Sequence, residues 1–363
     1  MFSGMILLLA IFIFMIRILS VIPLPFDATS YYRAYGVFPN LKEQLGGNLS
    51  WEPYGSHGRK YTWAELSGYD ILFLQRPGNP ENLKLIKYCK DLGLKIWIDH
   101  DDNLFQLPPY NRVHDEYTPE VKKAMLEMVK LADVLTVSTE ALRQFFATVG
   151  VVAEVVPNAL NEKLTPMATA YNETLPDNPD QFVWRGSETH HGDLYFHQEQ
   201  IIKAIEERPN TFWHFVGYNP WQITLFVDQK KYKYHKPDDI MVYTQNLKSL
   251  KAQVMHVPLV DDPLNQCKSN IAWIEATAAG MVTIGPDWHE WRKPGVMLYD
   301  SVDFYGQRLM MPEDNYKLRW KASRDYIMEN LTLDKVNQKR VDIVERLTSK
   351  KFYGNNLPPT MIE

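Results

Sequence analysis

Cysteine is scarce in this sequence, which contains only Cys89 and Cys267 among its 363 residues. Two cysteines cannot form the disulfide framework of a small secreted domain, and their scarcity is typical of a reducing compartment. No base in the sequence is placed to activate Cys267, so a catalytic thiol is not expected there. These observations exclude a disulfide-stapled scaffold and favour a cytoplasmic protein.

The sequence also lacks a strong excess of charge. Its formal net charge is -5, with 23% charged and 45% apolar residues, which is ordinary for a soluble globular protein. The chain has no net positive charge that would attract a polyanion, although the sequence leaves room for a local basic patch. We find neither repeats nor low-complexity tracts, so a solenoid is not expected.

The apolar run at residues 5–16 is too short to span a bilayer, which takes about 20 residues. Arg17 interrupts it, and neither a basic leading region nor a small-residue cleavage site of a signal peptide is clear. We therefore expect residues 1–14 to be an apolar extension of a domain that begins near Met15. The alternative is a weak, peripheral membrane association through residues 1–16.

What the sequence does contain is a repeated alternation of apolar strands and helices. Asn79, Thr118 and Thr139 each precede a helical stretch in a position to cap it. Strands joined by helices in this way indicate doubly wound, parallel sheets. The expected strands are 17–23, 69–75, 94–99, 133–138, 153–158, 181–186, 211–217, 240–245, 254–258, 281–285 and 295–300, with one probable helix within 29–46 that ends at Gly46.

A polar stretch rich in Pro and Asn interrupts the alternation after residue 158 and marks the best domain boundary. Two doubly wound domains that face each other form a cleft, and ligands of such sheets bind at the carboxyl ends of the strands. The expected division is an extension at 1–14, a first Rossmann-like domain at 15–160, a linker at 161–180, a second Rossmann-like domain at 181–312 and C-terminal helices at 313–350.

The segment 261–285 combines a helix start with a cation and a carboxylate. Ser269 or Asn270 is placed to cap the helix, and Gly280 to end it. Lys268 and Glu275 lie about two helical turns apart and point roughly the same way. A lysine at a helix N-terminus suits a phosphate, and a carboxylate suits a pair of hydroxyls, which together describe a nucleotide. The alternative is an ordinary core helix with a solvated Lys and Glu.

Polar side chains also cluster where the predicted strands end. The run at 99–102, Asp-His-Asp-Asp, is open to three interpretations: a magnesium site on a diphosphate, an acid–base group acting on a hydroxyl, or helix capping. His190, His191 and Asp193 lack a further ligand at a suitable spacing, so no metal is expected there. The strand-end residues are Arg76, Asp99, His100, Asp101, Asp102, Ser138, Thr139, Asn158, Arg185, Gly186, Ser187 and Gly217.

Three segments, in this order, resemble those of a known family. Residues 133–161 are similar to the end of the first domain of GT-B glycosyltransferases of the retaining glycosyltransferase family 4. Residues 184–194 are similar to the opening of that family's second domain, and residues 257–285 to its donor-binding signature. Cys267 stands where the commonest form of the signature has a first glutamate. The resemblance covers nearly all residues from Arg17 to the C-terminal helices.

The resemblance implies a nucleotide-sugar donor, no metal or other cofactor, and C-terminal helices that pack back on the first domain. Glu275 matches the residue that binds the nucleotide ribose, and Lys268 and Ser269 match the start of the phosphate-facing helix. The implied donor-binding residues are Arg185, Gly186, Gly217, Lys268, Ser269, Asn270 and Glu275. The implied catalytic residues are His100, Asp102, Arg185 and Lys268, and the implied acceptor-side residues are Arg33, Arg76, Asp99 and Asp101.

Two other functions stay open at this point. One is a sugar-nucleotide epimerase or hydrolase of the same fold, which would need no acceptor. The other is a non-catalytic protein that binds a nucleotide sugar. The expected acceptor is a glycan or a lipid-linked sugar, with modified nucleic acid or protein as alternatives.

Overall fold

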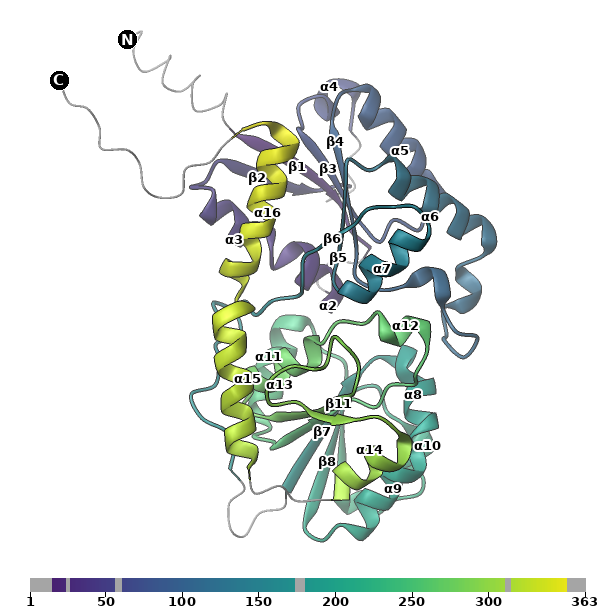
Figure 1. The fold of residues 1–363 in the computed structure, drawn as a ribbon, viewed down its shortest axis with the longest axis vertical. Helices are drawn as coiled ribbons and strands as arrows, with labels where there is room; N and C mark the ends of the chain where they lie inside the picture. The colour runs from purple at the N-terminus through teal and green to yellow at the C-terminus, as the bar shows by residue number, and fades with distance from the viewer. Residues whose placement is uncertain (1–14, 24–26, 56–60, 174–179, 311–314, 351–363) are drawn as a thin grey trace, which may run out of the picture.

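The computed structural model describes residues 15–23, 27–55, 61–173, 180–310 and 315–350, which form two domains stacked along the long axis of the molecule (Figure 1). Each domain contains one six-stranded sheet with helices on both faces. The fold is therefore two doubly wound, Rossmann-like domains, as the sequence predicts.

The first sheet has the strand order β2-β1-β3-β4-β5-β6, and all of its pairings are parallel. The strand order reverses between β1 and β3, which is where open sheets of this kind bind ligands. The strands are β1 (Ile16–Val21), β2 (Leu49–Pro53), β3 (Ile71–Gln75), β4 (Lys95–His100), β5 (Val134–Val137) and β6 (Glu154–Val155). The helices are α2 (Ala28–Ser30), the π-helix η1 (Tyr31–Tyr35), α3 (Phe38–Gln44), α4 (Trp63–Leu66), α5 (Pro80–Asp91), α6 (Pro119–Leu131) and α7 (Glu140–Thr148), with short 3-10 turns η3 (Leu104–Gln106) and η4 (His114–Glu116).

The second sheet is also parallel throughout and has the order β12-β11-β10-β7-β8-β9, so its reversal lies between β7 and β10. Its strands are β7 (Asp180–Gly186), β8 (Thr211–Gly217), β9 (Tyr232–His235), β10 (Val254–His256), β11 (Val282–Pro286) and β12 (Met297–Tyr299). Its helices are η5 (Glu188–His190), α8 (His191–Phe196), α9 (Gln198–Glu207), α10 (Trp221–Thr224), η6 (Gln229–Lys231), α11 (Ile240–Ser249), α12 (Pro263–Gln266), α13 (Ile271–Ala278) and α14 (Val302–Met310).

Three predicted helix starts are confirmed by side-chain caps. Asn79 accepts a hydrogen bond from the Glu81 amide at the start of α5. Thr118 and Thr139 cap α6 and α7 in the same way. Each cap satisfies an amide that has no partner within its helix, which is why these helices begin where they do.

The predicted cap of α13 is wrong. Asn270 occupies the N-cap position, but no side chain accepts a hydrogen bond from the first turn of the helix. The Asn270 side chain instead donates to the Glu290 carbonyl, and Ser269 Oγ accepts from Asn158. The helix ends as predicted, at Gly280, whose φ of +87° favours glycine.

The predicted strand at 240–245 is also wrong, because these residues begin helix α11. Asp239 caps that helix by accepting from the Met241 amide. Ile240, Thr244 and Leu247 are buried, and their spacing of four and three residues places them on one helical face. The edge strands β2 and β9 were not predicted, and the single helix expected within 29–46 is divided into α2, η1 and α3.

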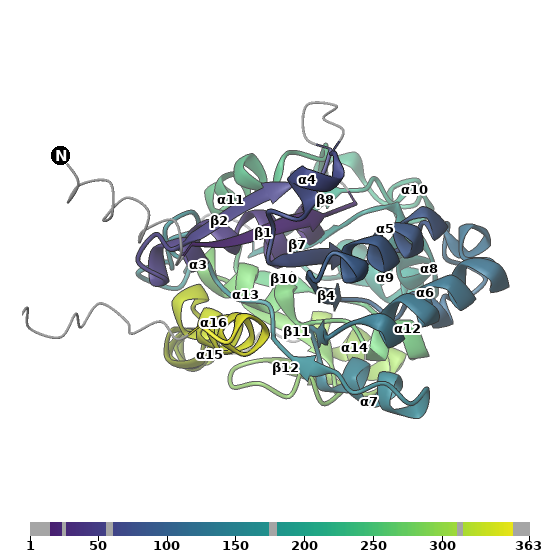
Figure 2. The same cartoon turned by 90° about the horizontal axis from the view of Figure 1, so that it is seen from above.

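The last two helices run along the side of both domains (Figures 1 and 2). Helix α15 (Tyr316–Asn330) buries Ile327 in the core of the second domain. Helix α16 (Leu333–Thr348) buries its apolar face in the core of the first domain, beside α3. The chain therefore returns to its first domain at its C-terminal end. None of the described helices is long and apolar enough to cross a membrane. The prediction for residues 1–14 lies outside the described residues.

The chain crosses between the domains twice, and the two crossings are hydrogen-bonded to each other. The Leu160 amide donates to the Leu331 carbonyl at 2.8 Å, and the Leu333 amide donates to the Leu160 carbonyl at 2.7 Å. This pairing fixes the two connections side by side, so any movement between the domains must bend both of them.

Candidate active site

A cavity of about 650 Å³ lies between the two domains and is lined by residues of both. The residues after β1, β3, β7 and β10 all contribute to its wall, so it sits at the strand-order reversal of both sheets. This is the position at which doubly wound sheets bind ligands.

Glu275 lies on α13 at the wall of this cavity and is only 4% exposed. Its carboxylate accepts hydrogen bonds from the hydroxyls of Tyr32, at 2.7 Å, and Tyr243, at 2.9 Å. Tyr32 belongs to the first domain, whereas Tyr243 is on α11 of the second. The carboxylate therefore joins the two domains across the cavity.

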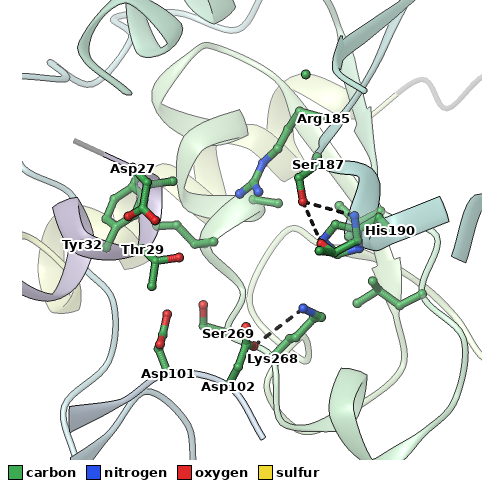
Figure 3. A pocket seen from close by; sticks show the side chains of 18 of the residues that line it. Asp27, Thr29, Tyr32, Asp101, Asp102, Arg185, Ser187, His190, Lys268 and Ser269 are labelled. Atoms are coloured by element: carbon green, nitrogen blue, oxygen red, sulfur yellow. Dashed lines mark hydrogen bonds and ion pairs between the residues drawn. The ribbon is translucent and has the colours of Figure 1, made fainter. Parts of the chain in front are cut away.

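Arg185 follows the buried part of β7 and points into the cavity (Figure 3). Its Nη2 lies 2.7 Å from Glu275 Oε2, so the two side chains form an ion pair. Burial would lower the pKa of Arg185, but the charge of Glu275 raises it overall. Arg185 is therefore a fixed cation on the cavity wall, paired with Glu275.

Gly186 and Gly217 are paired in register at the ends of β7 and β8 and line the cavity. Gly217 has a φ of +96°, and a Cβ at this position would lie 2.4 Å from the Gly186 carbonyl oxygen. The cavity wall is therefore formed by bare backbone here, which allows a ligand to approach closely.

Lys268 and Ser269 lie in the loop that leads into α13, and both line the cavity. The Lys268 ammonium is 3.7 Å from Asp102 Oδ1 of the first domain (Figure 3). Asn270 is not part of the lining. Ile271 and Ala272, in the first turn of α13, also line the cavity, and the N-cap residue of this helix makes no side-chain capping bond.

Arg76, Asp101 and Asp102 form a charged group on the first-domain wall. Arg76 Nε donates to Asp101, and its Nη2 donates to Asp102 Oδ2 at 2.7 Å. Burial raises the pKa of Asp101 to about 6. Burial would also raise the pKa of Asp102, but the positive charges of Lys268 and Arg76 outweigh it, so the pKa of Asp102 is lowered overall. The Arg76 backbone has a φ of +47°, a strained conformation for a residue other than glycine.

Besides Asn270, three of the predicted site residues do not line the cavity. Arg33 and Asp99 are buried and paired by two hydrogen bonds of 2.8 and 2.6 Å. His100 is fully buried and packs against Phe105 and Phe146. Burial lowers the pKa of His100 to about 4, so the ring is neutral at pH 7. These three side chains therefore lie behind the cavity wall, and Arg33 contacts the wall by donating to Asn158 Oδ1 at 3.0 Å.

Sequence patterns did not indicate Tyr32 and Tyr243, although both contact Glu275. Tyr32 lies in the π-helix η1, a rare form that often occurs at functional sites, but nothing in its local sequence marks that geometry. Tyr243 falls in the segment that was predicted as a strand. Both contacts depend on residues that are far apart in sequence, which single-sequence patterns cannot relate.

The His190–Asp193 pair is part of the second domain's hydrogen-bonding network. His190 Nδ1 lies 2.8 Å from Asp193 Oδ2, and Asp193 Oδ1 accepts from the Val260 amide and from Asn265. Across the described residues, no group of three or more His, Cys, Asp or Glu has an arrangement that could hold a metal ion.

Comparison with known proteins identifies the fold. No protein-family model matches the sequence, and no curated protein matches it either. The solved structure of a glycosyltransferase from Rickettsia africae is 13% identical, with a TM-score of 0.64 over 93% of this chain and 100% of that chain. Sucrose-phosphate synthase from Thermosynechococcus elongatus is 12% identical, with a TM-score of 0.62 over 92% of this chain and 99% of that chain.

The chain has the GT-B fold. A third similar structure, trehalose-6-phosphate from E. coli bound with UDP-2-fluoro glucose, is 11% identical, with a TM-score of 0.60 over 92% of this chain and 99% of that chain. At such identities the likeness establishes GT-B architecture, and the activity must be argued from the site itself.

Proposed function

We propose that this GT-B protein is a glycosyltransferase that moves a sugar from a nucleotide-sugar donor to an acceptor hydroxyl, with retention of the anomeric configuration. The observation that carries the proposal is the combination of Arg185, Lys268 and Glu275 on one wall of the interdomain cavity. Two cations suit a diphosphate, and a carboxylate suits the ribose diol beside it. The similar structure that contains UDP-2-fluoro glucose supports this class of donor.

In this mechanism the bond between the anomeric carbon and the donor phosphate oxygen breaks while the acceptor oxygen bonds to that carbon. The acceptor proton passes to the departing phosphate. Arg185 and Lys268 stabilise the negative charge that develops on the diphosphate. The uncapped N-terminus of α13 adds amide donors and a favourable helix dipole at the same place. The proposal requires no metal or other cofactor.

Binding of the ribose needs a local rearrangement at Glu275. An ionised carboxylate offers about four acceptor positions. Tyr32 and Tyr243 each use one, and the Arg185 guanidinium faces another. A ribose diol donates two hydrogen bonds, so at least one of these protein groups must move when a nucleotide binds.

The first experiment is a thermal-shift screen of nucleoside diphosphates and nucleotide sugars, because a ligand of the folded state raises the melting temperature. The nucleotide sugar with the largest shift is then incubated with and without candidate acceptors. We expect acceptor-dependent release of nucleoside diphosphate, and a product whose anomeric proton coupling matches that of the donor. Turnover that is equally fast without an acceptor would instead favour an epimerase or a hydrolase.

A variant pair tests the assignment of the phosphate site. Arg185→Met should weaken nucleoside diphosphate binding by at least tenfold, because charge-assisted hydrogen bonds to phosphate are lost. Arg292→Met is the matched control, since Arg292 is exposed, pairs with Asp287 and does not line the cavity. Equal binding by both variants would contradict the proposed site.

A further inference from the structure

The first-domain wall of the cavity is rich in carboxylates. Among the lining residues of that domain, the acidic side chains are Asp27, Asp101, Asp102 and Glu116, and the only Lys or Arg is Arg76. The phosphate-binding cations assigned above, Arg185 and Lys268, belong to the second domain. The part of the cavity that remains for an acceptor is therefore bounded by an acidic surface.

Arg76 lines the cavity but is paired with two carboxylates. Its Nε and Nη2 are both used by Asp101 and Asp102, and its side chain is only 20% exposed. The two carboxylates also surround it with more negative charge than it can neutralise. Lys268 approaches the same group from the second domain, at 3.7 Å from Asp102, and so balances part of that excess.

Phosphate binds in proteins to guanidinium and ammonium groups and to helix amides. Among the described lining residues of the first domain, Arg76 is the only Lys or Arg, and both Asp101 and Asp102 pair with it. Hydroxyl groups behave differently, since they donate hydrogen bonds to ionised carboxylates. The wall is thus suited to an uncharged polyhydroxyl group and repels a phosphate.

We infer that the acceptor is an uncharged saccharide whose reactive unit carries no phosphate. This inference rests on the proposed glycosyl transfer. The paired carboxylates Asp101 and Asp102 set this preference by neutralising Arg76. The same feature disfavours the phosphate backbone of a nucleic acid as the acceptor.

The test uses a hexose 6-phosphate and the corresponding uncharged hexose as probes, titrated into the full-length protein by calorimetry. A nucleoside diphosphate from the thermal-shift screen first saturates the donor site, so that its cations cannot bind the probe. If no nucleotide raises the melting temperature, the result counts against the proposed function. The probe titrations test the inference about the acceptor separately.

We expect no saturable binding of hexose 6-phosphate to the wild-type protein. The double variant Asp101→Asn with Asp102→Asn releases Arg76, so it should bind hexose 6-phosphate at least tenfold more tightly. The control double variant, Asp91→Asn with Glu127→Gln, changes the net charge equally at exposed positions outside the cavity and should behave like wild type. The single variant Asp101→Asn serves if the double variant does not fold.

Two results would overturn the inference. One is saturable binding of hexose 6-phosphate to the wild-type protein that is tighter than binding of the uncharged hexose. The other is that both the double and the single variant fold correctly but gain no affinity for hexose 6-phosphate. Arg76 would then not be the group that the carboxylates neutralise.

Discussion

Tyr32→Phe removes one hydroxyl that joins the two domains. In the structure this hydroxyl donates to Glu275 Oε1 at 2.7 Å, and the tyrosine is partly buried at the cavity wall. Burial, followed by the charge of Glu275, raises the pKa of Tyr32 well above its usual value, so the phenol stays protonated and remains a donor. The substitution therefore deletes a single charge-assisted hydrogen bond and leaves the aromatic ring.

The size of the effect follows from that bond. A hydrogen bond to a charged group contributes about 1.5–3 kcal/mol. If the ribose displaces the Tyr32 hydroxyl, the wild-type protein loses this bond on binding a nucleotide and the variant does not. Tyr32→Phe should therefore bind the nucleotide about tenfold more tightly or better, while its free energy of unfolding falls by about 1.5–3 kcal/mol.

Calorimetric titration with the nucleotide and urea denaturation measure the two effects. Tyr61→Phe is a matched control, because the Tyr61 hydroxyl also donates to a glutamate, Glu52, at 2.7 Å, and it does not line the cavity. The control should lose stability without any change in nucleotide affinity. Weaker nucleotide binding by Tyr32→Phe would refute the reasoning, since Tyr32 would then assist the ligand rather than compete with it.

Other contacts in the cavity and in the second domain give three more expectations. Glu275→Gln keeps the shape of the side chain but removes its charge, so calorimetry should show nucleoside binding weakened by about 10- to 100-fold; unchanged affinity would exclude a contact with the ribose. Lys268→Ala should weaken the binding of nucleoside diphosphate much more than that of the nucleoside, since only phosphate needs the cation, and an equal loss for both ligands would argue against this role. Burial, and next the neighbouring His235, lower the pKa of His214 from 6.5 to about 4, so the neutral ring is favoured in the folded state. The free energy of unfolding should therefore fall by up to about 3 kcal/mol as the pH decreases from 6.5 towards 4, and urea titrations should show a smaller fall for His214→Gln.

Local sequence signals predicted the elements that depend on local chemistry. The caps at Asn79, Thr118 and Thr139 and the stop at Gly280 were readable because each involves residues only a few positions apart. The edge strands β2 and β9 were missed because they are short and only partly buried, which leaves little apolar pattern. Helix α11 was mistaken for a strand because its first six residues are mostly apolar or β-favouring, and the buried Leu247 that completes the helical period lies just beyond them.

Much of the candidate site was predictable, either from strand ends or, for Lys268, Ser269 and Glu275, from the pattern of the segment 261–285. Arg76, Asp101, Asp102 and Arg185 follow strands and do line the cavity. Consecutive residues of a strand point to opposite faces of the sheet. Which of them would point to the cavity and which to the core was not predictable from the sequence. His100 thus faces a hydrophobic core although its neighbour Asp101 reaches the cavity.

The return of the last helix to the first domain has a consequence for how the chain folds during synthesis. The core of the first domain includes side chains between Leu333 and Leu347, so it cannot be completed while the ribosome is still making the second domain. Translation proceeds at about 5–20 residues per second, which leaves the first domain with an uncovered apolar face for many seconds. The second domain, by contrast, draws nearly all of its core from one continuous part of the chain. It can finish folding first, and the domain that emerges earliest is then closed last, by a helix that is made after the second domain.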